Sequence, residues 1–237
     1  MKILALDSTA KSATVSLCDG ESLVTLYSVT AGLNHSVTLL PMIENALKTA
    51  EWSIDDIDMF AISEGPGSFT GVRIGVSLIK GLAFGKGKPC VGVSTIEALA
   101  YNLKYIDGIV CPVMDARREQ VYNGIFKSEG GVLTRLTEDR AIPLKELEKE
   151  LKEKYGGQKI YLCGDGCELG KKTMDIEFSP TPVTLREQNA YSVAQTALAK
   201  YNADPDADYS DNTLKPTYLR VPQAERERLE RLNAEGN

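Results

Sequence analysis

The sequence predicts an α/β protein made of two copies of a β-β-β-α-β-α unit, with mixed sheets and helices on the sheet faces. Two observations support this fold class. Patterns typical of strands and helices follow one another in the same order in both halves of the chain. Each half also opens with an apolar strand pattern that ends in an aspartate, Asp7 in the first half and Asp115 in the second. We therefore divide the 237 residues into an N-terminal unit, 1–106, and a C-terminal unit, 107–237.

The first unit is expected to open with three strands, followed by alternating helices and strands. Its first helix carries Leu39 and Ile43 on an apolar side, at the spacing of an amphipathic helix. The expected elements are strands at 2–7, 13–18, 23–29, 57–62 and 89–93, and helices at about 36–50, 70–85 and 95–103.

The second unit repeats this order. A helix at about 144–155 has leucines at helical spacing and is ended by Gly156 and Gly157. The tail at 223–237 alternates Glu and Arg, which is typical of a solvated helix. Packing back on the first unit and acting as a partner-binding arm are the alternatives for this tail. The expected strands are at 109–115, 120–127, 132–137 and 159–163.

Composition describes an ordinary soluble globular protein, with 43% hydrophobic and 25% charged residues. No stretch approaches the roughly 20 apolar residues that a membrane helix needs, and the chain opens on a strand pattern rather than a signal peptide. The five cysteines are odd in number and contain no C-x-x-C, which favours reduced thiols in the cytoplasm. The net charge of −6 makes direct binding of a nucleic acid by the isolated chain a poor prospect, because the basic excess that releases counterions is missing. Contact with nucleic acid is expected through a partner.

The most specific motif is the run from Ser63 to Gly75, SEGPGSFTGVRIG. It leaves a buried strand through a Gly-Pro-Gly turn and enters a helix, where α/β proteins usually place a binding site. Ser68 or Thr70 can cap that helix. The glycine spacing is G-x-G-x-x-x-G, which fits neither the dinucleotide nor the P-loop signature. Spacing alone therefore favours a tight connection without a ligand.

Small residues mark one face of the following helix. Gly71, Gly75, Leu78 and Leu82 fall on the same side at 100° per residue. Since glycine inside a helix costs roughly 1 kcal/mol relative to alanine, the stripe suggests close approach of another helix. That helix could belong to the same domain or to another chain.

The duplicated order resembles the actin-like (ribonuclease H-like) ATPase architecture of sugar kinases and Hsp70. That resemblance implies a phosphate-holding hairpin after the first strand of each unit, here at Asp7-Ser8 and at Asp115-Ala116-Arg117. Neither hairpin contains the glycines that let backbone N–H groups face phosphate, so ATP hydrolysis by this chain alone is not expected. The run Gly164-Asp165-Gly166 resembles a degenerate adenosine loop, and a simple turn explains it equally well.

Longer matches make the resemblance more specific. The chain resembles the TsaB family, also called YeaZ, in the runs at 3–8, 35–42, 65–75, 91–94, 114–117, 121–122 and 215–220. The resemblance implies a non-catalytic scaffold subunit of the complex that installs threonylcarbamoyl on the adenosine beside the anticodon of tRNAs. It also implies pairing with the transferase TsaD and the ATPase TsaE, contact with tRNA through that complex, and a homodimer when the chain is alone.

The resemblance further implies that no residue here is catalytic, that no metal or cofactor is bound strongly by the isolated chain, and that ATP, ADP and metal belong to the partners. A glycoprotease-type metallopeptidase and an actin-like ATPase or kinase are the alternatives. The single histidine and the absence of H-E-x-x-H oppose the first alternative, and the glycine-poor hairpins oppose the second. Helices at about 36–50 and 70–85 are expected to form the partner interface, through His35, Leu39, Ile43, Gly65, Gly67, Thr70, Gly71, Gly75, Leu78 and Leu82.

Overall fold

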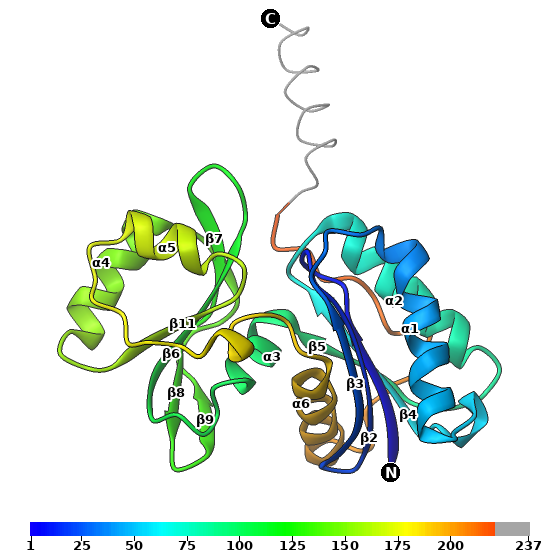
Figure 1. Cartoon of the computed structure of the whole chain (residues 1–237). Coiled ribbons are helices and arrows are strands. Elements are labelled where there is room, and N and C mark those ends of the chain that lie inside the picture. Colours follow the sequence, from blue (N-terminus) through cyan, green and yellow to red (C-terminus); the bar gives the residue numbers. More distant parts are fainter. Residues whose placement is uncertain (221–237) are drawn as a thin grey trace, which may run out of the picture.

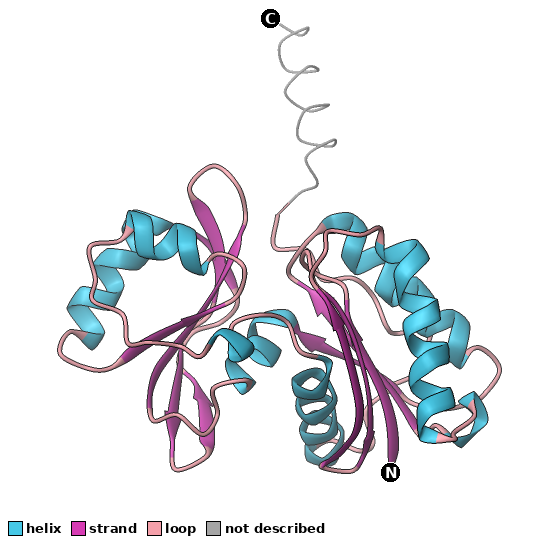
Figure 2. Cartoon of the chain, in the orientation of Figure 1, coloured by secondary structure: helices cyan, strands magenta, loops and turns pink. Residues whose placement is uncertain are grey.

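The protein forms two sheets with helices on both sides of each, and the two units stand side by side (Figure 1). The structure is a computed structural model that describes residues 1–220. Figure 2 shows the resulting succession of layers: a pair of helices, a sheet, a central helical layer, the second sheet and a second pair of helices. The predicted fold class is confirmed.

The first sheet has the strand order β3-β2-β1-β4-β5. Strands β1, β4 and β5 run parallel, whereas β2 and β3 are antiparallel to their neighbours. Helices α1 and α2 cover one face, and α6 covers the other, with α3 beside it in the central layer. The bounds of these elements are β1 (Lys2–Asp7), β2 (Ala13–Asp19), β3 (Ser22–Val29), α1 (His35–Ala50), η1 (Ile54–Asp56), β4 (Met59–Gly65), α2 (Phe69–Ala83), β5 (Cys90–Ser94), α3 (Thr95–Tyr101) and α6 (Ala190–Ala203).

The second sheet has six strands, in the order β10-β7-β6-β8-β9 with β11 parallel to β6, against five strands in the first sheet. The strand expected at 120–127 is broken at Gly124, and its two pieces pair with different ends of β6. The Asn123 amide donates to the carbonyls of Pro112 and Gly124, and Thr137 Oγ1 accepts from the Ile125 N–H, so side chains replace the ladder bonds at the break. The elements are β6 (Gly108–Asp115), β7 (Gln120–Asn123), β8 (Phe126–Glu129), β9 (Val132–Arg135), β10 (Arg140–Pro143), α4 (Leu144–Tyr155), β11 (Ile160–Cys163), α5 (Cys167–Thr173) and η2 (Val183–Leu185).

Each unit has its own apolar core on the outer side of its sheet. In the first unit, α1 buries Leu39 and Ile43 against the sheet. In the second unit, Leu144, Leu147 and Leu151 of α4 are buried against β6 and β11 in the same way. The helical spacing of these side chains in the sequence therefore identified core faces correctly.

The C-terminal part of the chain corrects the predicted boundary. Helix α6 lies on the first sheet, where Val193 and Ala197 pack against Ile3 and Met59. Assigning all of 107–237 to the second unit was therefore wrong for residues 190–220. The inner face of β1 is apolar and needs a cover, and the chain returns to supply it. The predicted charged tail at 223–237 lies outside the described residues.

Candidate functional site

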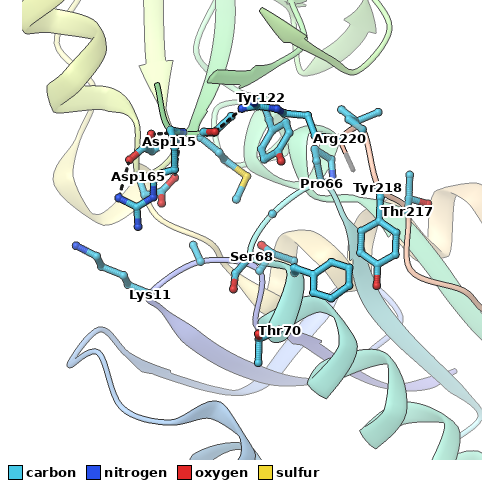
Figure 3. A pocket seen from close by; sticks show the side chains of 18 residues that line it. Lys11, Pro66, Ser68, Thr70, Asp115, Tyr122, Asp165, Thr217, Tyr218 and Arg220 are labelled. Atoms are coloured by element: carbon cyan, nitrogen blue, oxygen red, sulfur yellow. Dashed lines mark hydrogen bonds and ion pairs between the residues drawn. The ribbon is translucent and has the colours of Figure 1, made fainter. Parts of the chain in front are cut away.

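A cleft of about 550 Å3 opens between the two units (Figure 3). It is bounded by the two hairpins that follow β1 and β6, the glycine loop that enters α2, and the last described segment of the chain. The lining residues are Thr9, Ala10, Lys11, Pro66, Gly67, Ser68, Phe69, Thr70, Met114, Asp115, Ala116, Arg117, Tyr122, Asp165, Thr217, Tyr218, Leu219 and Arg220.

The first hairpin uses its polar groups inside the protein. Asp7 is 1% exposed, and its Oδ1 accepts from the backbone N–H and the hydroxyl of Thr9 at 2.8 and 2.7 Å. Burial raises the pKa of Asp7, and the bonds from Thr9 partly offset this rise. Ser8 is fully buried, and its Oγ donates to the Gly71 carbonyl. Asp7 and Ser8 are therefore not part of the cleft wall.

The second hairpin faces the cleft. Asp115 Oδ1 accepts from the Arg117 N–H at 2.7 Å, and Arg117, Arg118 and Glu119 all have a positive φ, from 55° to 64°. Non-glycine residues rarely adopt this left-handed conformation, and three in a row store strain of about 1–2 kcal/mol each. This turn leaves the side chains of Arg117 and Arg118 exposed beside the cleft.

Asp165 contributes a second carboxylate to the cleft, next to the Asp115 backbone N–H. Asp165 is an exposed residue, but the protein packed around its carboxylate desolvates the charged form and raises its pKa to about 6. The negative charges of Glu187 and Asp115 add to this rise. The cleft thus holds two carboxylates, Asp115 and Asp165, together with three cations that also line it, Lys11, Arg117 and Arg220.

The two glycines beside Asp165 have a packing role. A Cβ on Gly164 would lie 2.3 Å from the Val113 carbonyl oxygen, and one on Gly166 would lie 2.9 Å from the same atom. These glycines let the loop after β11 approach β6, as in a tight turn. Of the three residues expected to form an adenosine loop, only Asp165 lines the cleft.

The glycine loop is a junction between segments of this same chain. A Cβ on Gly67 would lie 2.5 Å from the Thr9 carbonyl oxygen, one on Gly71 would lie 2.0 Å from that of Ser8, and one on Gly75 would lie 2.4 Å from Ser8 Oγ. The glycine stripe of α2 therefore accommodates the end of β1. The expected close approach is real, but placing Gly71 and Gly75 at an interface with another chain was wrong, because they are buried against their own sheet.

Residues 214–220 cross the glycine loop, and we name this segment the strap. The Thr217 N–H donates to the Glu64 carbonyl at 2.7 Å, and a Cβ on Gly65 would lie 2.2 Å from the Thr217 carbonyl oxygen. At the far end of the strap, Arg220 Nη1 donates to the Ala116 carbonyl at 2.6 Å (Figure 3). The strap therefore joins the glycine loop of the first unit to the hairpin of the second. Thr217 and Leu219 also line a second cavity, of about 710 Å3, between the units.

The expected interface residues separate into buried and exposed groups. Leu39 and Ile43 are 0% and 1% exposed, so the helix that carries them cannot use them to contact a partner. Leu78 and Leu82 are half-buried, and Thr70 is exposed. Gly65, like the glycines of α2, faces its own chain. The exposed apolar side chains near this surface are instead Leu33, Val37 and Leu40 at α1, and Phe84 after α2.

His35 has a structural contact within the first unit. Its Nε2 lies 2.8 Å from the Ala10 carbonyl oxygen, which joins the start of α1 to the first hairpin. Among residues 1–220, no group of three or more His, Cys, Asp or Glu side chains is placed to hold a metal ion. No helix in the same range is long and apolar enough to cross a membrane.

Several residues of the site could not be recognised as site residues from the sequence, although some lie in the runs that resemble the TsaB family. Lys11 and Tyr122 line the cleft because two hairpins from different halves of the chain meet there. Tyr218 joins the site through Phe69, with ring centroids 4.8 Å apart. Only the tertiary arrangement brings these residues together.

Comparison with known proteins agrees with the topology. The family model described as TsaD, tRNA N6-adenosine threonylcarbamoyltransferase, matches residues 29–231. A transferase of that name from Jannaschia sp. (strain CCS1) is 39% identical, but over only 34% of this chain and 22% of its own length.

Full-length similarity is found with smaller proteins. The tRNA threonylcarbamoyladenosine biosynthesis protein TsaB from Bacillus subtilis (strain 168) is 31% identical over 97% of this chain and 99% of its own. The solved structure of YeaZ from Pseudomonas aeruginosa superposes with a TM-score of 0.76 at 24% identity, covering 92% of this chain and 99% of that one. The chain therefore belongs to the TsaB (YeaZ) family.

Proposed function

We propose that this chain is a non-catalytic subunit of the cytoplasmic machinery that makes threonylcarbamoyladenosine in tRNA, and that it works beside a TsaD-type transferase and a TsaE-type ATPase. The family relationship over the whole chain supports the pathway. The geometry of the two hairpins supports the non-catalytic role.

The closed first hairpin is the observation that carries the proposal. In a phosphate-binding hairpin, backbone N–H groups are free to face the ligand. Here the Thr9 N–H donates to Asp7, the Thr9 carbonyl accepts from the Ser68 N–H at 2.7 Å, and the Ala10 carbonyl contacts His35. The Thr9 N–H is thereby used by Asp7, and the two carbonyls fix the hairpin against the glycine loop and α1. A hairpin that uses its N–H group inside the protein and contains no glycine favours a scaffold over an ATPase or a kinase.

ATP, ADP and any metal therefore belong to the partners in this proposal. The metallopeptidase alternative gains no support from His35, because a lone histidine at the start of a helix with one ring nitrogen near a carbonyl has the geometry of a structural contact.

The outer face of α1 is the proposed contact with the transferase. Leu33, Val37 and Leu40 are 55%, 69% and 43% exposed, and Pro41 is exposed beside them. Apolar side chains gathered on one helix face mark an interaction site more often than scattered ones do. The same face is the proposed contact between two copies when the transferase is absent, so the two assemblies would compete.

A reconstituted modification reaction tests the catalytic part of the proposal. Threonylcarbamoyladenosine is measured in tRNA with the transferase and the ATPase present, with this chain added or omitted. We expect the chain to be required and the Asp115→Asn variant to support at least half of the normal rate. A 100-fold loss in a variant with an unchanged Tm would assign Asp115 a role in the chemistry and overturn the scaffold reading.

A matched pair of surface variants tests the interface. Val37→Glu places a charge on the outer face of α1, whereas Val132→Glu places the same charge on β9, where Val132 is 63% exposed. We expect only Val37→Glu to weaken binding to the transferase, by tenfold or more, because a buried unpaired carboxylate costs more than about 1.4 kcal/mol. Equal affinities for the two variants would place the interface elsewhere.

A further inference from the structure

We propose that the rim of the inter-unit cleft is an RNA-contacting surface that binds the sugar-phosphate backbone of tRNA in the assembled complex. This inference rests on the proposed function and adds the surface of this chain that touches the RNA. The rim is defined by five cations. Lys11, Arg117 and Arg220 line the cleft itself. Arg73 is included because it donates to the lining residue Tyr218, and Arg118 because it is exposed next to Arg117 in the second hairpin.

The rim concentrates positive charge on a chain whose net charge is −6. Within the described residues, the single ion pair at the rim joins Arg117 Nη1 to Asp115 Oδ2, at 3.4 Å. Some cations elsewhere in the described chain are paired with carboxylates, as Lys152 is with Glu148 at 2.7 Å. Cations without counter-charges are available to neutralise phosphates and release their counterions.

Four separate segments supply these cations. Lys11 comes from the first hairpin, Arg73 from α2, Arg117 and Arg118 from the second hairpin, and Arg220 from the strap. The rim therefore spans both units, and its cations come from segments on both sides of the cleft. An extended polyanion fits that arrangement better than one anionic side chain does.

Two arginines of the rim are held in position before any ligand binds. The Arg73 guanidinium lies 3.8 Å over the Phe69 ring, and its Nε donates to the Tyr218 hydroxyl at 2.8 Å. No hydrogen-bond partner for Arg73 Nη1 or Nη2 is found among residues 1–220. Arg220 is fixed by its bond to the Ala116 carbonyl. Preorganised guanidinium groups lose less side-chain entropy when they bind phosphate.

Aromatic rings accompany the cations. Tyr218 is 39% exposed at the rim, and Tyr122 is half-buried in the wall of the cleft. Rings beside arginines can stack on unpaired bases, as in single-stranded RNA recognition. This combination favours RNA over an acidic protein segment.

The acids near the rim favour a polynucleotide over a mononucleotide. Asp115 and Asp165 line the cleft and would repel the phosphates of a nucleotide placed next to them. A backbone that follows Lys11, Arg73 and Arg118, which form no ion pair within residues 1–220, is less exposed to this repulsion. Glu119 in the second hairpin and Glu187, whose charge acts on Asp165, are two further acids, so five cations face four acids.

Salt-dependent binding of labelled tRNA to the assembled complex tests the proposal. The rim variant is Lys11→Ala/Arg118→Ala, because neither side chain makes an ion pair or hydrogen bond within residues 1–220. The control is Lys145→Ala/Lys172→Ala, which removes two exposed cations from α4 and α5 and changes the net charge equally. Both complexes are measured between about 50 and 300 mM KCl, after saturation with the transferase.

We expect the slope of log K against log salt to be less steep by about 2 in the rim variant, since each phosphate contact contributes about 1 to that slope. Its tRNA affinity near 100 mM KCl should fall about tenfold. The control should change neither value. Identical behaviour of the two variants overturns the rim proposal, and so does a rim variant that loses the transferase while its saturated complex keeps full tRNA affinity. If the unsubstituted complex binds tRNA no better than the partners alone, the rim proposal fails, whereas the proposed function is tested separately by the reconstituted modification reaction.

Discussion

Substituting Gly71 tests the conclusion that the glycine stripe is an internal junction. A Cβ at this position would lie 2.0 Å from the Ser8 carbonyl oxygen, whereas real Cβ atoms do not approach such atoms within 3.0 Å. The obstacle is backbone, so α2 has to move away from the sheet by about 1 Å in the Gly71→Ala variant. The neighbouring side chains Val72 and Val76 are 1% and 3% exposed, and they would lose contacts in the same movement.

The expected change in the free energy of unfolding follows from two opposing contributions. Overpacking of this kind typically costs about 1–3 kcal/mol, and alanine returns roughly 1 kcal/mol of helix propensity. Because the obstacle is backbone and cannot rotate away, we take the upper part of that cost, about 2–3 kcal/mol. We therefore expect Gly71→Ala to destabilise the protein by about 1–2 kcal/mol, which lowers the Tm by about 2–8 °C for a chain of this size. Gly81→Ala is the matched control in the same helix, because no atom lies within 4 Å of its Cβ position. The control should gain about 1 kcal/mol and raise the Tm by about 2–4 °C.

Thermal unfolding by circular dichroism, combined with transferase binding to the folded variants, provides the assay. The Tm of Gly75→Ala should lie between those of the other two variants. The atom nearest to its added Cβ is Ser8 Oγ, at 2.4 Å, which belongs to a side chain and can rotate. All three folded variants should keep normal affinity for the transferase. A Gly71→Ala variant that keeps its Tm but loses the transferase would refute the internal junction and restore the interface with another chain.

Three further predictions concern other parts of the molecule. Gly65 has a φ of 122°, and a Cβ there would clash with the Thr217 carbonyl. Gly65→Ala should therefore displace the strap and accelerate backbone hydrogen exchange in it. Unchanged exchange would contradict the close contact. The pKa of Asp165 is raised to about 6 from a reference of 3.8, so the protonated carboxyl favours the folded state. This contribution to stability is lost as the pH rises from about 4 to 6. Asp165→Asn should therefore raise the Tm at pH 7.5 more than at pH 4.5. All five cysteines are buried and free, and burial raises the pKa of Cys111 and Cys167 to about 12. A thiol reagent should therefore label none of them rapidly before denaturant is added. Fast labelling of one cysteine would show an exposed thiolate.

The amphipathic helices were predictable because each has its apolar side chains on one side only. Helix α1 begins at His35 and ends at Ala50, against an expectation of 36–50, and Ser68 caps α2 as one of two candidates. Helix α6 was missed for the opposite reason. Its residues from Ser192 to Ala197 are all buried, and they include the polar Ser192, Gln195 and Thr196. Burial therefore does not follow polarity in this helix, and its apolar face of mostly small residues gives a weak periodic signal.

The candidate site was predictable only in part. Asp115, Arg117 and Asp165 line the cleft, because strand ends in a duplicated fold meet where the two units face each other. Asp7 and Ser8 matched the same pattern but turn inward, since Ser8 bonds to Gly71 of the adjacent helix. The spacing of glycines shows that something approaches closely. It does not show which segment does so, and here the segments are β1 and the strap.

The return of the chain to its first sheet has a consequence for biosynthesis. Strand β5 ends at Ser94, whereas α6 ends at Ala203, and ribosomes take on the order of 10 s to add the residues between them. During that interval the side chains of Ile3, Met59 and Val91 lack α6, and only the short helix α3 can pack on this face. Leu214, which is 4% exposed in the other core of the first sheet, is synthesised later still. The N-terminal half therefore cannot finish folding while the second half is being made, and a fragment ending at residue 106 should aggregate rather than fold as a free-standing domain.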